Sequence, residues 1–259
     1  LNTDSLAVSP NTGPLTTAIP CGPVDIDLDA IRERGVLRAI TCYSATSYFV
    51  FKGRPMGFEY ELVSSLAEDL GVELDIVVAR DLDRVFDMLN CGEGDIITYG
   101  TAVTKERIKQ VAFTRYYMAS RQVLVQRKPP NWRRITEQQL DRLLIRNQLD
   151  LIGKPVHIRR GSSYYPRLLA LSEELGGDID IRIADSDLTT EGLIAMVAEG
   201  VIEYTVADES IAMINSAYYP NIDIKTPVSF PQRIAWAVRK NALNLLETTN
   251  AWIAQRQAD

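Results

Sequence analysis

The stretch DIITYGTAVTKERIKQVAFTRYY, residues 95–117, decides the fold class. An apolar run over 95–99 ends at Gly100, and Thr104 then opens a segment with helical spacing of its apolar residues, which predicts a helix over 105–113. A strand that passes through a glycine into a helix is the repeating unit of α/β sheets. Arg107 is unusual there, because a cation in the first turn adds to the positive end of the helix dipole. An anion bound at that helix end would explain it.

The same alternation of strands and helices continues on both sides of this stretch. Between residues 36 and 127 the pattern predicts strands at 36–41, 72–79 and 121–127, helices at 58–71 and 82–94, and a hairpin turn at Lys52-Gly53. Later it predicts strands at 154–160, 179–185, 202–208 and 232–240, with helices at 136–144, 164–176, 188–200, 209–218 and 244–257. The chain is therefore expected to form two α/β blocks, each a mostly parallel sheet covered by helices.

Composition excludes several classes of function. The chain has 259 residues, is 46% hydrophobic, and carries a formal net charge of -6 without a basic block, which argues against nucleic acid as a partner. No apolar run approaches the roughly 18 residues that span a bilayer. The single histidine, His157, lies in mid-strand, and the three cysteines share no CxxC spacing, so neither a metal site nor a cofactor is expected. Two of the three cysteines could form one disulfide, and the sequence leaves both outcomes open.

Ligands of open α/β sheets bind where strand ends meet helix starts. Three junctions fit this rule, at 100–107, 160–163 and 208–210. At the first, Gly100 permits close approach to the backbone, and the Arg107 fork could clamp a carboxylate. The alternative for Arg107 is a surface ion pair with a nearby glutamate.

The other two junctions offer complementary chemistry. Asp208 ends an apolar strand and could hold an ammonium group, although it could equally cap the following helix. Ser162 and Ser163 open a helix and could meet a carboxylate oxygen, or simply serve as caps. Tyr43 and Tyr48 could pack on the apolar part of a ligand, or belong to the core.

Four motifs in this order resemble the family 3 periplasmic solute-binding proteins: GFEYEL (57–62), the stretch at 94–117, RRGSSYY (159–165) and EGVIEYTVADES (199–210). The resemblance covers about residues 31–257. GFEYEL and EYTVADE are nearer to the solute-binding modules of the lytic transglycosylase F subgroup than to free amino-acid carriers.

The resemblance implies a type II periplasmic-binding-protein fold, with two Rossmann-like α/β lobes joined by a two-strand hinge. Mapped onto this sequence, residues 1–30 are an N-terminal extension that is partly irregular. Lobe 1 is expected at 31–126 and 228–259, and lobe 2 at 127–227.

Residue by residue, the resemblance also implies a ligand site. Arg107 would clamp the α-carboxylate together with Gly100, Asp208 would hold the α-ammonium, and Ser162 and Ser163 would meet the carboxylate. Tyr48, with Tyr43 beside it, would cover the ligand side chain. Ala102 is a further contact position where carriers often have a threonine, and Cys42 stands where they often have an acidic residue.

These departures favour a sensor over a carrier. The resemblance implies a periplasmic, monomeric module that binds an amino acid or a peptidoglycan-derived peptide and regulates a C-terminal murein-cleaving domain absent from this chain. Whether a lipid anchor to the outer membrane precedes Leu1 stays open. The alternatives are an amino-acid-binding protein of an ABC importer, and a cyclohexadienyl-dehydratase-like enzyme on the same fold. As a binding module the chain is not expected to be an enzyme.

Overall fold

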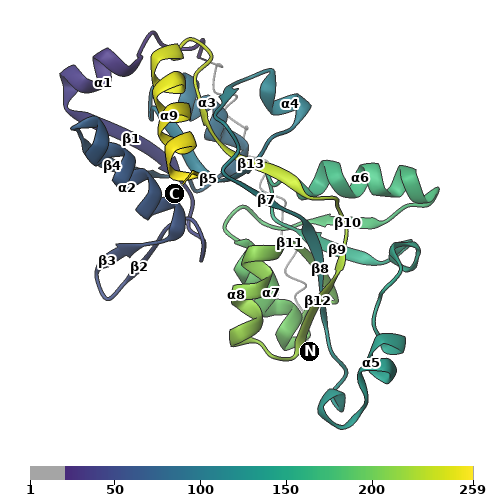
Figure 1. Cartoon of the computed structure of the whole chain (residues 1–259). Helices are drawn as coiled ribbons and strands as arrows, with labels where there is room; N and C mark the ends of the chain where they lie inside the picture. Colours follow the sequence, from purple (N-terminus) through teal and green to yellow (C-terminus); the bar gives the residue numbers. More distant parts are fainter. Residues whose placement is uncertain (1–20, 259) are drawn as a thin grey trace, which may run out of the picture.

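Two mixed sheets, each with helices on both faces, form two lobes in the computed structural model, which describes residues 21–258 (Figure 1). The type II fold expected from the sequence is confirmed. Residues 1–20 of the partly irregular N-terminal extension predicted at 1–30 lie outside the described residues. None of the helices within 21–258 is long and apolar enough to cross a membrane.

The sheet of the first lobe has the strand order β4-β1-β5-β13-β6, with β7 also paired to β13. Strand β1 runs parallel to β4 and β5, whereas β13 runs antiparallel to β5, β6 and β7. The bounds are β1 Val36–Thr41, β4 Glu73–Val78, β5 Ile96–Ala102, β6 Ala112–Phe113, β7 Met118–Ser120 and β13 Gln232–Val238.

Alternate residues of β1 point to opposite faces of this sheet, as the two-residue period of a strand requires. Leu37 and Ala39 pack with α1 (Leu28–Arg34), α2 (Phe58–Leu70) and α9 (Leu243–Arg256). On the other face, Ile40 packs with α3 (Val85–Asn90) and the short helical turn η1 (Leu82–Arg84). The sheet is thus buried on both faces, and its strand ends are left to form a site.

The second lobe repeats this arrangement with the strand order β10-β9-β11-β8-β12. Helices α7 and α8 pack against Val123 and Val125 on one face, and α6 packs against Leu124 on the other. The bounds are β8 Gln122–Arg127, β9 Pro155–Ile158, β10 Asp180–Ile183, β11 Tyr204–Asp208, β12 Ile222–Pro227, α5 Glu137–Leu143, α6 Tyr164–Leu175, α7 Thr190–Glu199 and α8 Glu209–Tyr218.

The chain passes between the lobes twice, from β7 to β8 and from β12 to β13 (Figure 1). The two passages are tied together, because the amide of Gln122 donates to Ser229 Oγ at 2.9 Å and the amide of Val228 donates to the Gln122 carbonyl at 2.9 Å. Strand β8 pairs with β11 and β12, so residues 122–127 belong to the second sheet. The boundary between the lobes that was expected after residue 126 therefore lies too late in the sequence.

The helix predicted over 105–113 is wrong in length, because α4 spans only Lys105–Ile108. Ala112 and Phe113 instead pair with β13 at the edge of the sheet, and this strand pairing replaces the helical hydrogen bonds that the prediction assumed. The sheets are mostly parallel, as expected, because a single strand in each runs antiparallel to its neighbours: β13 in the first sheet and β8 in the second. Strand β12 had no counterpart in the sequence prediction. The hairpin of β2 (Phe49–Phe51) and β3 (Arg54–Met56) is confirmed.

A disulfide between Cys21 and Cys91 ties the start of the described chain to the end of α3, and Cys42 is a free, buried thiol. The bond closes a loop with a sequence separation of 70 residues. Its main effect is to restrict the unfolded chain, so long loops gain the most.

We expect the double substitution Cys21→Ser with Cys91→Ser to lower the free energy of unfolding by about 2–4 kcal/mol. Urea unfolding with and without a reductant would measure it. Reductant should destabilise the wild-type protein and leave the double variant unchanged. Equal stability of the two proteins under oxidising conditions would contradict a stabilising role.

Candidate ligand-binding site

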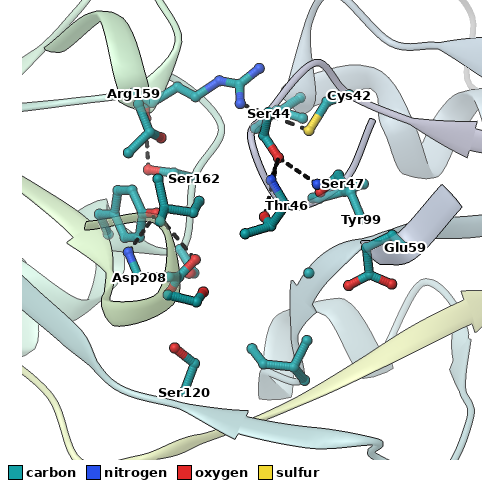
Figure 2. Close-up of a pocket in the computed structure, with 18 of the residues that line it drawn as sticks. Cys42, Ser44, Thr46, Ser47, Glu59, Tyr99, Ser120, Arg159, Ser162 and Asp208 are labelled. Atoms are coloured by element: carbon teal, nitrogen blue, oxygen red, sulfur yellow. Dashed lines mark hydrogen bonds between the residues drawn. The ribbon is translucent and has the colours of Figure 1, made fainter. Parts of the chain in front are cut away.

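A cavity of about 330 Å³ lies between the lobes, where the carboxyl ends of strands from both sheets meet (Figure 2). This is the place that the α/β rule predicts for a ligand. Its lining from the first lobe includes Cys42, Ser44, Thr46, Ser47, Phe58, Glu59, Tyr99, Gly100 and Arg107. Its lining from the second lobe includes Arg159, Ser162, Ser163, Tyr164, Thr190, Asp208 and Ser210.

Arg107 reaches this cavity from the single turn of α4. Thr104 caps that turn, its hydroxyl accepting from the Arg107 amide at 3.3 Å. The guanidinium folds back, donates to the Ala102 carbonyl at 3.1 Å and lies 5.5 Å from the centre of the Phe86 ring. No carboxylate within residues 21–258 forms an ion pair with it. The structure thus gives no support to the surface ion pair, and the cation is available to an anion in the cavity.

Asp208 lines the cavity from the second lobe, at the end of β11 (Figure 2). It occupies the N-cap position of α8, yet its side chain makes no capping hydrogen bond. Instead Oδ2 accepts from the hydroxyl of Tyr164 at 3.2 Å. Burial raises the pKa of Asp208 to about 6, against the lowering effects of Tyr164 and of the Arg107 charge. The carboxylate is desolvated and would gain from a cationic partner.

The serines and the glycine of the predicted site also line the cavity. Neither serine caps α6: the Ser162 hydroxyl donates to the Arg159 carbonyl at 2.7 Å, and Ser163 Oγ accepts from Gln122 Nε2 at 3.0 Å. Gly100 faces Glu59, because a Cβ built there would lie 4.0 Å from Glu59 Oε1. A side chain at position 100 would therefore narrow the cavity.

Three residues of the predicted site lie outside the lining. Tyr43 is exposed, and Tyr48 packs against Tyr43 and Tyr60 in tilted arrangements, with ring centres 5.8 and 5.7 Å away. Phe58 and Tyr99, rather than Tyr48, are the first-lobe aromatics that line the cavity. Ala102 contributes its carbonyl to Arg107 but does not border the cavity.

Sequence reasoning missed Glu59, a carboxylate that is 2% exposed and lines the cavity. Its Oε2 accepts from Trp236 Nε1 at 2.7 Å, and Oε1 accepts from the Tyr117 hydroxyl. Burial raises its pKa to about 7 despite these two donors. The signal was present in the sequence, because Glu59 shares the helical face of Val63 and Leu66, where a charged residue is unexpected.

Arg159 was also missed, although it directly follows strand β9 and is only 8% exposed. The detectable signal was a charged residue at the end of the apolar run PVHI. No cluster of metal-ligating side chains occurs within the described part of the chain.

Arg107 and Asp208 thus present opposite charges to one cavity, and the Arg107 charge acts on the Asp208 carboxyl. An arginine fork suits a carboxylate, and a desolvated carboxylate suits an ammonium group. This combination is chemically complementary to the zwitterion of an α-amino acid or to a peptide end.

Residues 38–259 match the sequence pattern of the bacterial extracellular solute-binding proteins, family 3. The chain belongs to this family. The resemblance seen in the four sequence motifs is therefore confirmed, and the family 3 match spans both lobes and the hinge.

Curated relatives of this family 3 chain include membrane-bound lytic murein transglycosylases F. The protein of Desulfosudis oleivorans is 36% identical over 220 residues, covering 85% of this chain and 45% of the relative. The protein of Stutzerimonas stutzeri is 33% identical over 244 residues, covering 92% of this chain and 46% of the relative. The chain thus spans slightly less than half the length of these relatives.

Solved structures similar to the family 3 chain include amino-acid-binding proteins. A mutant of the arginine-binding protein of T. maritima superimposes with a TM-score of 0.72 at 28% identity, covering 89% of this chain and 93% of that one. An ancestral amino-acid-binding protein, a precursor of cyclohexadienyl dehydratase, gives 0.71 at 26% identity, covering 90% and 94%. The L-cysteine receptor of Neisseria gonorrhoeae gives 0.76 at 21% identity, covering 90% and 89%, which supports the fold alone.

Proposed function

We propose that this chain is an envelope sensor module that binds an amino acid or a peptidoglycan-derived peptide in the cavity between its lobes. The observation that carries the proposal is that Arg107 of the first lobe and Asp208 of the second line one cavity, while no carboxylate within the described residues forms an ion pair with Arg107. In this proposal Arg107 binds the ligand carboxylate and Asp208 binds its ammonium group. Ser162 and Ser163 add hydroxyls on the carboxylate side.

The proposed regulatory role is control of a murein-cleaving domain. It is supported by the transglycosylase relatives, which are roughly twice as long as this chain. Closure of two lobes on a ligand is a hinge motion that an attached domain can sense. The family and the membrane-bound relatives favour a periplasmic or envelope-associated location, and the disulfide is typical of an oxidising compartment. We expect the module itself to be monomeric.

An enzyme on this fold needs an acid–base group in the cavity, and Glu59, with its raised pKa, is a candidate. Both of its oxygens already accept hydrogen bonds, from Tyr117 and Trp236. Both oxygens are thus engaged by core donors, which favours a structural role for Glu59, and hence binding over turnover. A carrier for an ABC importer would use the same cavity and is distinguished by its ligand.

Thermal melting against a panel of amino acids and murein stem peptides tests the proposal. A ligand that binds only the folded state stabilises it by about 2.7 kcal/mol at a hundredfold excess over its Kd. We expect stem peptides to raise the melting temperature and to be recovered unchanged. A rise with one free amino acid alone would favour the importer protein, and consumption of prephenate would favour the dehydratase. No rise with any compound would overturn the proposal.

A further inference from the structure

Arg159 crosses the cleft between the lobes. It starts from the end of β9 in the second lobe, and its Nη1 lies 3.9 Å from Sγ of Cys42 in the first lobe (Figure 2). Only 8% of the residue is exposed, and no carboxylate within residues 21–258 forms an ion pair with it. Its guanidinium is therefore a buried cation in the wall of the cavity.

The thiol cannot balance this charge. Burial raises the pKa of Cys42, so the group beside the guanidinium is a neutral thiol. A buried charge without a counter-ion is costly, because desolvation is not offset by a partner. A guanidinium also carries five donors in a planar fork, and a single contact with sulfur leaves most of them unused.

Tyr99 adds a second unused group to this corner of the cavity. It is 8% exposed, and its hydroxyl is buried without a hydrogen-bond partner in the described structure. The positive charges of Arg107 and Arg159 both lower the pKa of this phenol, while burial has the larger, opposite effect. Tyr99, Arg107 and Arg159 all line the same cavity, so two cations and one phenol donor face the same space.

Two carboxylates act on Cys42 through their charges, Glu191 of α7 and Glu59 of α2. The two oxygens of Glu59 accept from Tyr117 and Trp236. Oε1 of Glu191 accepts from the Ala45 amide at 2.8 Å, which joins the two lobes. Its other oxygen is buried without a partner. Glu191 is thus committed to the lobe contact and makes no ion pair with Arg159.

From Arg159 and Tyr99 we infer a second anion subsite, which selects ligands that carry a second carboxylate besides the one bound by Arg107. This inference rests on the proposed function, because it extends the same cavity. The ligand class is a dicarboxylic amino acid, or a peptide with a free side-chain carboxylate. In such a ligand the second carboxylate accepts from the guanidinium of Arg159 and from the hydroxyl of Tyr99.

Matched ligand pairs that differ by one charge test the subsite. The pairs are L-glutamate with L-glutamine, and L-alanyl-γ-D-glutamate with L-alanyl-D-isoglutamine. Calorimetry on the wild-type chain should show at least about tenfold tighter binding of the dicarboxylate in one pair, since charged hydrogen bonds are the strong ones. Arg159→Gln should abolish the preference, and Arg159→Lys should keep part of it. Circular dichroism would confirm that both variants are folded.

The outcomes separate this inference from the proposed function. Equal affinity for both members of a pair, or a preference retained in Arg159→Gln, would overturn the second subsite alone. If the wild-type chain shows no preference and Arg159→Gln weakens the binding of both ligands equally, the subsite is overturned. Arg159 would then serve only as a structural contact between the lobes. Binding of no member of either pair would overturn the subsite, while the stem-peptide panel would still decide the proposed function.

Discussion

Arg107→Ala is expected to weaken ligand binding by at least about thirtyfold, because truncating one partner of a desolvated charge pair typically costs about 2–5 kcal/mol. The fold should survive, since the guanidinium's contacts are the Ala102 carbonyl and the face of Phe86. Calorimetry with whichever compound raises the melting temperature in the panel would measure the loss.

The matched control for this experiment is Lys105→Ala. Lys105 lies in the same helical turn and carries the same charge, but it is exposed and does not line the cavity. The control should bind as the wild-type protein does. Equal affinity of Arg107→Ala and Lys105→Ala would remove Arg107 from the site.

Asp208→Asn is expected to change binding and stability in opposite directions. At pH 7 the variant should lose the ammonium contact and bind its ligand at least about thirtyfold more weakly. The ligand-free variant should be more stable than the wild-type protein by about 1–3 kcal/mol, because the buried charge is gone and the amide oxygen can still accept from Tyr164. Urea unfolding and calorimetry would measure the two effects.

The pKa of Asp208 fixes the pH range of both effects. Its pKa rises from 3.8 to about 6 on folding, so between these values the folded state holds a proton that the unfolded state has lost. The Asp208 contribution to stability is therefore most favourable below about pH 4 and declines as the pH rises to about 6. Ligand affinity should fall by up to tenfold per pH unit below about pH 6, as the carboxylate is neutralised.

In Asp208→Asn this dependence should disappear, and the stabilities of the two proteins should converge at low pH. A stability difference that stays constant from pH 4 to pH 7 would show that Asp208 does not titrate in this range. A variant that binds ligand as tightly as the wild-type protein would remove Asp208 from the site, whatever its stability.

The sequence alone determined the architecture and the two oppositely charged residues of the candidate site, Arg107 and Asp208. Periodicity of two for strands and of about 3.6 for helices is a local property, and it predicted most elements within a few residues. Gly100, Arg107 and Asp208 were found for the same reason, because each stands at a strand end or a helix start. In an α/β sheet those ends share one edge, so local position was enough to bring these residues to one cavity.

Tertiary structure decided what depends on partners far along the chain. Pairing with β13 ended α4 after four residues, and Tyr117 and Trp236 surround Glu59. Arg159 faces Cys42 across the cleft, while Tyr48 packs against Tyr43 and Tyr60 and does not line the cavity. Desolvation and counter-charges are set by the whole fold, so the protonation and pairing of these groups could not be predicted from neighbours in sequence.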